Sequence, residues 1–477
     1  MNVSAWGYRG VRRGSRDEAP AGKGIIVRTQ SLGDQTVDLL GRLVRLGCVN
    51  DLTADSGGEE RAADLLEEFF AGLPVSIERI TPHPGRTSLV VTVEGADPRS
   101  AGTPLTLLGH TDVVPVDTAK WTRDPFGAQI EDDVMWGRGT VDMLHLTAAM
   151  AVVTREVARR AQDGNPLARS LVFVAAADEE ARGGLGVPWI GDNKPNALPW
   201  DAALSEMGGA HVRGRRGGDS VVVVVGEKGA AQRRLHIRGD AGHGSVPLGR
   251  MSAVERLAQV SAALSAARWP TATDEVWAGF VRAFEFDETI ETSLINGTYE
   301  GDYSEFEDLA AFAHAISHVT VAQTVAHSGG PINVLPSHAT LELDIRTLPG
   351  VNDDDVDAAI AAALGDLAEH VTIERLLSEA ATASSIDTDL YRVIEAALTQ
   401  RYPGTRVVPV LFPGGSDLRV ARRLGGIGYG FGAVDSGASL GLVYSQLHAH
   451  DEHIALADVR ATAEVLHEVV TSYLTDV

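Results

Sequence analysis

Two adjacent glutamates end one of the apolar runs of this chain. The run is "LVFVAAADEE", residues 171–180. Glu179 and Glu180 would repel each other if both were ionised in a dry site. A solvated turn is the ordinary explanation for such a pair. The other explanation is a bound cation that removes the repulsion, and the rest of the chain has to decide between the two.

Other residues that can bind a metal ion also stand near the expected ends of strands. They are His110 and Asp112 in "LLGHTDVV", Asp142 in "WGRGTVDM", Glu206 in "ALSEMGG", and His448 in "SQLHAHDEHI", with His450 and His453 nearby. Ligands of open α/β sheets bind outside the carboxyl ends of the strands, so these separate segments can converge on one crevice. Taken together, they favour a metal centre over a set of unrelated turns.

The types of these residues limit the choice of metal. Imidazole with carboxylate and no thiolate suits zinc or another divalent first-row metal. Cys48 is the only cysteine, so a cysteine-based cluster and an internal disulfide are excluded, and we expect it to be a small buried residue. Two histidines with three carboxylates are too many for one tetrahedral ion that keeps an open position. They suit two ions about 3.5–4 Å apart that share a bridging carboxylate.

The elements that must position these residues alternate along the chain. Apolar strands are separated by amphipathic helices, which predicts an α/β fold with a mostly parallel sheet and helices on both faces. Residues 140–161, "TVDMLHLTAAMAVVTREVARRA", predict a long helix with Thr140 as its N-cap and Asp142 in its first turn. This pattern covers residues 31–227 and resumes over residues 381–477, so we expect one catalytic domain in two segments.

Between these segments, residues 228–380 predict a smaller inserted domain. Its strands alternate apolar and polar residues, which is typical of a sheet with one solvated face. The expected order is β-α-β-β-α-β, the ferredoxin-like α+β arrangement, over residues 231–239, 252–268, 317–327, 338–347, 351–370 and 371–376. An acidic insertion at residues 270–312 has no predicted place in it.

Composition excludes several classes of function. The chain has 477 residues, enough for two or three compact units, and a formal charge of −24, which argues against a nucleic-acid partner. No apolar run is long enough to span a membrane. Residues 1–30 are expected to form a loose extension, because basic residues there are not followed by an apolar segment as in a signal peptide. A cytoplasmic location is therefore expected.

The motifs as a set resemble a known family. The string "GHTDVVPV…WGRGTVDM…ADEE…SEMGG…GHGSVP…NVLP…LDIR…GGSD…LHAHDEH" is similar to that of the di-zinc amidohydrolases and exopeptidases, metallopeptidase family twenty. This family includes acetylornithine deacetylase, succinyl-diaminopimelate desuccinylase, glutamate carboxypeptidase and aminoacylase. The resemblance runs from about residue 40 to the C-terminus. It implies a zinc-exopeptidase-like catalytic domain with an inserted lid and dimerisation domain, and therefore a homodimer.

The resemblance also implies a role for each metal-site residue. Asp142 would bridge two divalent ions, most often zinc in such enzymes, with cobalt or manganese as substitutes. His110 and Glu206 would complete the shell of one ion, and Glu180 and His448 that of the other. His448 is preferred to His450 because it fits the family pattern His-x-x-Asn/Asp-Glu.

The remaining roles concern catalysis and substrate binding. By resemblance, Glu179 would be the general base, Asp112 would orient the ligand His110, and His243 would stabilise the oxyanion, in many members within the partner subunit. Asn333 and Arg346 would hold the carboxylate of the substrate, and the loop containing Gly415 and Ser416 would contact it. One departure is Leu144, which stands where many members have a lysine.

The reaction expected from these features is hydrolysis of an amide or peptide bond next to a free carboxylate. We interpret the chain first as an exopeptidase of the dipeptidase or carboxypeptidase type. The alternative is an N-acyl-amino-acid deacylase of the acetylornithine deacetylase or desuccinylase type. A metal-free binding protein on the same fold is a remote alternative. The sequence does not identify the substrate, the native metal or the oligomeric state.

Overall fold

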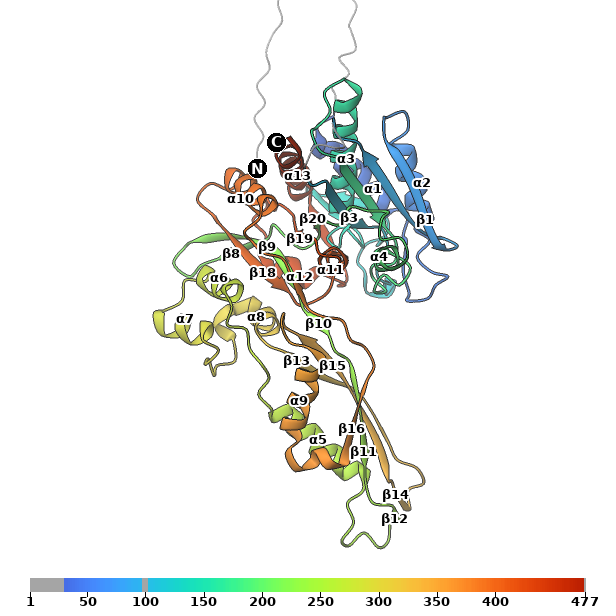
Figure 1. The fold of residues 1–477 in the computed structure, drawn as a ribbon, viewed down its shortest axis with the longest axis vertical. Coiled ribbons are helices and arrows are strands. Elements are labelled where there is room, and N and C mark those ends of the chain that lie inside the picture. Colours follow the sequence, from blue (N-terminus) through green and yellow to red (C-terminus); the bar gives the residue numbers. More distant parts are fainter. Residues whose placement is uncertain (1–29, 97–101, 476–477) are drawn as a thin grey trace, which may run out of the picture.

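The computed structural model describes residues 30–96 and 102–475. The N-terminal extension expected over residues 1–30 lies outside the described residues, apart from residue 30. Figure 1 shows a broad upper part built on a large sheet and a narrow lower part built on a second sheet. No helix among the described residues is long and apolar enough to cross a membrane.

The large sheet has four parallel strands at its centre. The order of the sheet is β1 (Ser76–His83), β2 (Arg86–Val93), β6 (Leu171–Ala176), β3 (Leu105–His110), β7 (Ala202–Ser205), β19 (Ile427–Gly430), β9 (Asp219–Glu227) and β17 (Thr382–Ala383), while β18 (Arg406–Phe412) and β8 (His211–Arg213) also pair with β9. Strands β6, β3, β7 and β19 run parallel, and antiparallel strands flank them. This is the mostly parallel sheet predicted from the sequence.

Helices cover both faces of this sheet, which explains why its strands are continuously apolar. Phe173 of β6 faces one core, whereas its neighbours Val172 and Val174 face another. The first core contains α1 (Leu32–Val44), α2 (Glu60–Phe69), α3 (Leu144–Gln162), α10 (Asp389–Arg401) and α13 (Leu456–Thr475). The second contains α4 (Val187–Asn193) and α11 (Leu418–Arg423). Cys48 lies in the first core and is buried, as expected.

The second sheet is antiparallel and lies in the lower part of the molecule (Figure 1). Its strands are ordered β13 (Thr320–Ser328), β15 (His338–Thr347), β11 (Arg233–Arg238) and β16 (Val371–Arg375), and β10 (Gly229–Ala230) pairs with one end of β15. Buried and half-buried residues alternate along β15. The buried side packs against α5 (Ala253–Ala266) and α9 (Asp353–Leu364). The boundaries proposed for an inserted domain, 228 and 380, stay a prediction.

Several predicted elements differ from the observed ones at their ends. The helix expected over residues 351–370 ends at Leu364, because Gly365 has a left-handed φ of 53° and a 3₁₀ turn (Gly365–His370) follows. Ser317, expected to begin a strand, instead ends α8 (Ala310–Ser317), and its hydroxyl donates to the carbonyl of Ala313. Such terminal differences are the least predictable part of an element.

The acidic insertion at residues 270–312 forms short helices that join the two parts. They are α6 (Glu275–Ala283), α7 (Glu288–Ile295), the 3₁₀ helix η2 (Ser304–Leu309) and the start of α8. Helix α6 packs on β18 of the large sheet. Phe280, Phe284 and Phe306 form an aromatic cluster in its core, with ring centroids 4.7–6.1 Å apart. The insertion therefore shares one hydrophobic core with the second sheet and with β9 and β18 of the large sheet.

Helix α3 begins at Leu144, so the predicted N-cap at Thr140 is wrong. The Thr140 hydroxyl donates to the carbonyl of Gly137 instead. Asp142 precedes the helix and does not lie in its first turn. The reason is Glu452, whose buried carboxylate accepts the backbone N–H groups of Gly139, Val141 and Asp142 and holds them in a turn.

Candidate metal centre

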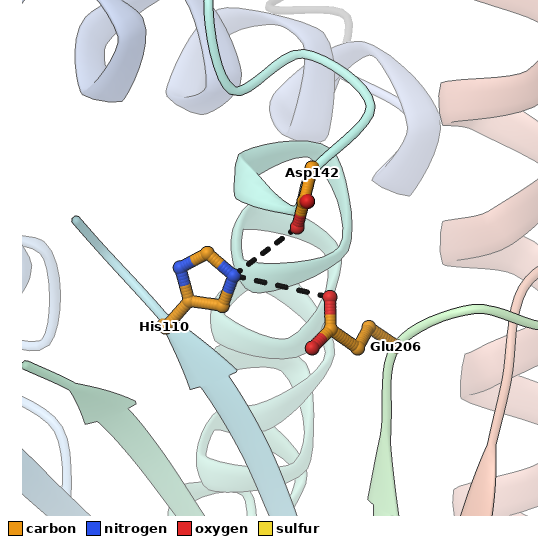
Figure 2. Close-up of side chains that lie close together, drawn as sticks. All are labelled: His110, Asp142 and Glu206. Atoms are coloured by element: carbon orange, nitrogen blue, oxygen red, sulfur yellow. Dashed lines mark hydrogen bonds and ion pairs between the residues drawn. The ribbon is translucent and has the colours of Figure 1, made fainter. Parts of the chain in front are cut away.

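The first group of metal-ligating side chains forms where β3 ends. His110 is the last residue of β3 and is buried, with 1% of its surface exposed. Its Nε2 lies 3.3 Å from Asp142 Oδ1 and 3.8 Å from Glu206 Oε2. Figure 2 shows that the three side chains point toward one another from β3, the turn before α3 and the loop after β7. One ligand atom from each lies within 4.8 Å of the others.

A second group shares Asp142 with the first. His448 Nε2 lies 3.4 Å from Asp142 Oδ2 and 3.2 Å from Glu180 Oε2. Asp142 therefore directs one oxygen to each group, which is the geometry of a bridging carboxylate. The five residues expected to bind metal from the sequence, His110, Asp142, Glu180, Glu206 and His448, come together in these two groups.

A small sheet brings the C-terminal segment to the site. Strand β20 (His453–Ala455) pairs with β5 (Val134–Trp136), which pairs with β4 (Gln129–Glu131). The loop before β20 carries His448, whose φ of 60° lies in the left-handed region. Asp178 and Met207, beside the other ligands, also have positive φ values. Such conformations cost free energy and tend to cluster at functional sites.

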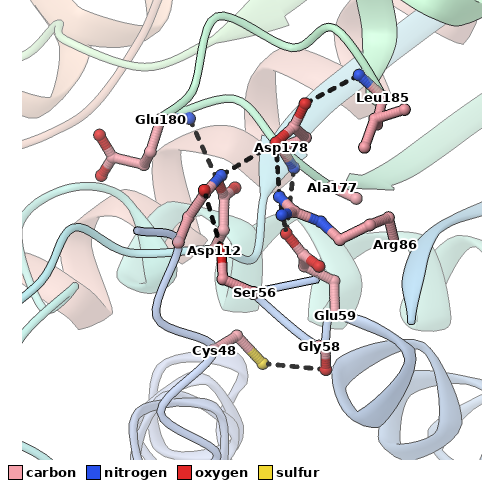
Figure 3. Close-up of polar contacts among 12 residues, drawn as sticks. Cys48, Ser56, Gly58, Glu59, Arg86, Asp112, Ala177, Asp178, Glu180 and Leu185 are labelled. Atoms are coloured by element: carbon pink, nitrogen blue, oxygen red, sulfur yellow. Dashed lines mark hydrogen bonds and ion pairs between the residues drawn. The ribbon is translucent and has the colours of Figure 1, made fainter. Parts of the chain in front are cut away.

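Asp112 supports both the histidine and the glutamate pair, and Figure 3 shows its contact with Glu180. Its Oδ1 accepts the backbone N–H of Glu179 at 3.2 Å, and its Oδ2 accepts that of Glu180 at 3.1 Å. The ring Nδ1 of His110 lies 2.9 Å from the Asp112 carbonyl oxygen and 3.5 Å from its carboxylate. The backbone of Asp112 thus orients the imidazole more closely than its side chain does. The side chain mainly fixes the turn that carries Glu179 and Glu180.

A buried ion network lies behind this turn, and sequence reasoning did not find it. Arg86 is fully buried, and its Nη2 lies 2.6 Å from Asp178 Oδ1 and 2.8 Å from Glu59 Oε1 (Figure 3). Asn50 donates to both Asp112 and Asp178. The nearest signal in the sequence was Asp178, the acidic residue directly before the glutamate pair. Arg86, Glu59 and Asn50 lie far away in the sequence and match no motif.

The charges at the centre match the needs of a cation. Burial, followed by repulsion from Asp142, raises the pKa of Glu206 to about 8 and that of Glu180 to about 7. Glu180 Oε1 and Glu206 Oε2 are buried and accept no hydrogen bond from the described residues. Buried carboxylate oxygens without donors are costly unless a cation compensates them. The donor set of two imidazoles and three carboxylates therefore fits two divalent first-row ions.

A polar cavity of about 420 Å³ opens beside the two groups. Its lining includes Glu179, Glu180, Asp142, Arg346 and Gly415. The carboxylate of Glu179 makes no hydrogen bond or ion pair with another described residue, although its backbone is fixed. Burial raises the pKa of this carboxyl, with Glu206 as the nearest repelling charge. The Glu179 carboxylate therefore lies where a molecule in the cavity can contact it.

Gly415 lines the cavity, whereas Ser416 does not. Its N–H and hydroxyl both donate to the buried carboxylate of Glu227, each at 2.7 Å. Gly415 leaves room for Arg419, because a Cβ at Gly415 would lie 2.8 Å from Arg419 Nη1. The expected contact between the substrate and the loop that contains Gly415 and Ser416 stays a prediction.

Arg182, Lys228 and Arg419 are three further cationic residues of the cavity that sequence reasoning missed. The Arg419 guanidinium donates to the carbonyl of Arg182 and forms no ion pair within 4 Å among the described residues. Lys228 Nζ donates to the carbonyls of Ala315 and His318, both at 2.6 Å. Arg419 follows the "GGSD" motif by two residues, so this motif was the available signal.

His243 and Asn333 lie far from the centre, at the lower tip of the molecule (Figure 1). His243 belongs to β12 (Gly242–His243), which pairs with β14 (Val334–Leu335). The N–H of Gly244 donates to the carbonyl of Asn333, so the two predicted residues are neighbours. Both are exposed. The structure does not bring them to the metal-ligating groups of the same chain.

Leu144, where the family resemblance led us to expect a lysine, is buried in the core. A Cβ at Gly139 would lie 2.7 Å from a methyl group of Leu144 and from one of Val113, so these residues pack tightly behind the centre. Leu144 therefore acts in packing, and the metal-ligating residues keep their arrangement without a lysine at this position.

Comparison with known proteins gives a consistent result. The model of peptidase family M20/M25/M40 matches residues 106–472. The chain is 27% identical over 344 residues to "Probable carboxypeptidase S-like 2" of Dictyostelium discoideum. This match covers 70% of this chain and 64% of that protein, so the chain spans less than two thirds of the length of that relative. It is 27% identical over 451 residues to succinyl-diaminopimelate desuccinylase of Cereibacter sphaeroides, covering 92% and 98% of the two chains.

The fold is also shared with solved structures. An M20 family metallo-carboxypeptidase from Sulfolobus solfataricus superposes with a TM-score of 0.66 at 21% identity, covering 92% of this chain and 99% of that one. At this level of identity, the similarity shows a common fold and not a common substrate. The zinc-exopeptidase-like α/β fold expected from the sequence is confirmed.

Proposed function

We propose that this chain, which belongs to peptidase family M20/M25/M40 by its match over residues 106–472, hydrolyses an amide or peptide bond next to a free carboxylate. One observation carries the proposal. Asp142 directs one oxygen to each of two metal-ligating groups, and Glu179 lines the polar cavity beside them. This combination suits hydrolysis assisted by two metal ions.

The proposed cofactors are two divalent ions, with zinc as the first candidate and cobalt or manganese as substitutes. His110, Asp142 and Glu206 would hold one, and Asp142, Glu180 and His448 the other. When bound, such ions polarise the carbonyl of the substrate and make water a stronger acid. The buried, unpartnered oxygens of Glu180 and Glu206 support this assignment.

Glu179 would act as the general base. Its carboxylate would take a proton from the attacking water and deliver it to the leaving amine, a transfer typically worth about 10²–10⁴ in rate. Two observations support the role: the carboxylate has no partner among the described residues, and Asp112 fixes the backbone N–H of Glu179. The backbone is thus held rigidly while the side chain stays available.

The free carboxylate of the substrate would bind to the cationic side of the polar cavity. Arg346, Arg419 and Lys228 all line it. A guanidinium binds a carboxylate through two parallel hydrogen bonds, which fixes the direction of the substrate as well as its position. Arg346 is engaged by Asp344 at 3.1 Å, whereas Arg419 forms no ion pair within the described part of the chain, so Arg419 is the more available of the two.

His243 and Asn333 would act across a homodimer. They lie at an exposed tip, too far from the centre of their own chain to contact its substrate (Figure 1). Leu248 and Ile332 on this tip are almost fully exposed, at 95% and 103%. Exposed apolar side chains of this kind mark interaction sites. In a symmetric dimer, each tip would reach the polar cavity of the partner and place His243 beside the developing oxyanion.

Two classes of substrate fit this chemistry. A dipeptide or a C-terminal residue would make the chain an exopeptidase, our first proposal. An N-acyl amino acid would make it a deacylase, and the match to succinyl-diaminopimelate desuccinylase over 92% of the chain favours this second candidate. Both would be hydrolysed by the same ligands and the same base.

A substrate panel with controlled metal content tests the proposal. The chain is stripped with a chelator, reloaded with zinc, cobalt or manganese, and assayed on dipeptides and N-acyl amino acids. We expect no hydrolysis by the stripped protein and restored hydrolysis after reloading. Matched amides without the free carboxylate should be poor substrates. Hydrolysis that persists without metal, or no hydrolysis of any member with metal, would refute the proposal.

A further inference from the structure

A second cavity of about 210 Å³ adjoins the polar one. The two cavities share a wall made of Glu206, Met207, Phe412, Tyr444 and Leu447. Glu206 is one of the metal-ligating residues, so the second cavity begins where the scissile bond would lie. The cationic residues Arg346, Arg419 and Lys228 line the polar cavity but not this second one.

The walls of this second cavity are mainly apolar. They include Val134, Leu146, Ala210, Phe431 and Val443, and helix α12 (Leu440–Gln446) covers one side. Most of the polar side chains along the cavity are satisfied within the fold. Asp458 accepts the N–H and hydroxyl of Ser436, and the Thr462 hydroxyl donates to the carbonyl of Ala433. Two buried atoms of the lining, His145 Nδ1 and Glu206 Oε2, have no hydrogen-bond partner among the described residues, and the remaining lining is mainly apolar.

Aromatic rings stand where the two cavities meet. The ring of Tyr444 lies 5.3 Å from that of Phe312 and 6.4 Å from that of Phe412. Tyr444 is half-exposed, at 38%, so this entrance is accessible from the polar side. An apolar group of a ligand that passes between these rings would lose its contact with water.

The size of the cavity argues against an ordinary packing defect. Protein interiors contain few voids larger than a water molecule, and an engineered apolar cavity of about 150 Å³ stays dry and binds benzene. The space beside Glu206, at about 210 Å³, is larger. Because this space also adjoins the polar cavity, ligand binding explains it better than a packing defect does.

We propose that this cavity is a subsite for an apolar group on the acyl side of the scissile bond. The inference rests on the proposed function. If the carboxylate of the substrate binds near Arg346 and Arg419 and the amide lies beside Glu206, the acyl side points into the second cavity. The substrates would then be N-acyl amino acids with a medium-length alkyl or an aromatic acyl group, or dipeptides with a large apolar first residue.

A chain-length series tests this subsite. N-acyl derivatives of one amino acid, from acetyl to hexanoyl, are compared by kcat/KM. We expect kcat/KM to rise roughly fourfold with each methylene that becomes buried. A parallel rise is expected from a glycyl to a leucyl or phenylalanyl dipeptide. Equal kcat/KM values for acetyl and hexanoyl substrates would overturn the inference.

Val443→Phe fills the cavity from α12 and is the main variant. It should lower kcat/KM for the hexanoyl substrate at least tenfold and leave the acetyl substrate nearly unchanged. Ser445→Phe is the matched control, because Ser445 lies on the same helix but does not line the cavity. If Val443→Phe does not fold, as judged by its melting temperature, Val443→Met gives a smaller loss in the same direction. Unchanged hexanoyl kinetics in a folded cavity-filled variant would contradict the subsite.

A binding experiment separates this inference from the proposed function. Hexanamide and acetamide are titrated against the full chain by ligand-observed NMR. We expect hexanamide to bind, acetamide not to bind, and Val443→Phe to abolish the difference. If no amide is hydrolysed but hexanamide still binds in this way, the proposed function fails and the apolar site stands. If hydrolysis occurs without any difference between the two amides, the apolar site fails alone.

Discussion

The carboxylate of Asp112 accepts the backbone N–H of Glu180 at 3.1 Å, and its other oxygen accepts that of Glu179 at 3.2 Å. One buried side chain therefore fixes the turn between the proposed base and a proposed metal ligand. Both glutamates line the polar cavity, but the Glu180 carboxylate pairs with His448, whereas that of Glu179 has no partner among the described residues. The different surroundings of the two carboxylates explain why two acidic residues can be adjacent at the end of a buried strand.

Replacing Asp112 by alanine should loosen this turn and weaken metal binding. The substitution removes the acceptor for two backbone donors and for Asn50. Loss of a residue that supports metal ligands typically lowers metal affinity about 10- to 100-fold. Competition with a chromogenic chelator measures the affinity. The control is Asp117→Ala, a change at a half-exposed residue. If Asp112→Ala binds metal with wild-type affinity, the Asp112 side chain does not support the metal-ligating residues.

Replacing Arg419 by glutamine should raise KM and change kcat little. Charged hydrogen bonds contribute about 1.5–3 kcal/mol, which corresponds to roughly 10- to 100-fold in KM if substrate and transition state are held equally. Arg423→Gln is the matched control, because Arg423 lies on the same helix and pairs with Asp192 away from the cavity. If Arg419→Gln has the same KM as the wild type, Arg419 does not bind the substrate.

Subunit mixing should reveal whether His243 acts across a dimer. His243→Ala and Glu179→Gln are each expected to be nearly inactive. In a mixed dimer, the His243→Ala subunit has an intact base and receives an intact histidine from its partner. Random mixing of two inactive variants into twofold dimers should therefore restore roughly a quarter of the active sites. The measurement is activity after unfolding and refolding the two together. If dimers that are shown to contain one subunit of each variant recover no activity, His243 does not act across the dimer.

The pH dependence of stability should depend on metal. In the metal-free protein, burial raises the pKa of Glu206 to about 8 and of Glu180 to about 7, above the value of an unfolded chain. The folded state then binds more protons between about pH 4.5 and 8, so stability falls as pH rises through this range. Metal binds the ionised forms and should reverse the trend.

Melting temperatures at about pH 5.5 and about pH 8, with chelator and with zinc, check this prediction. The metal-free protein should melt at a lower temperature at the higher pH, and the stabilisation by zinc should increase with pH. Glu206→Gln should flatten the metal-free dependence. A metal-free protein that gains stability between these two pH values would contradict the burial of unpaired carboxyls at this centre.

The fold and the centre were largely predictable because their signals are local. Continuous apolar runs such as residues 171–176 gave the central strands, and alternating runs such as His338–Thr347 gave the second sheet. The five metal-ligating residues stand near strand ends or in short motifs, so their types and places could be read from the chain. The structure brings all five together.

The remaining features depend on contacts between distant segments. The start of α3 is set by Glu452, more than 300 residues away, so the helical pattern before Leu144 was misleading. Arg86 and Glu59 meet Asp178 only in the folded chain. The residues that line the apolar cavity lie between Val134 and Thr462, so no single stretch of the sequence predicts the cavity.

The central claim is that Glu179 is the base of a centre with two metal ions. The most direct measurement is the metal content and the hydrolysis rate of Glu179→Gln, with the wild type and Glu180→Ala purified in parallel. We predict that Glu179→Gln keeps two metal ions per chain and loses activity by about 10²–10⁴, whereas Glu180→Ala loses metal. A Glu179→Gln protein with full metal content and wild-type activity would contradict the account.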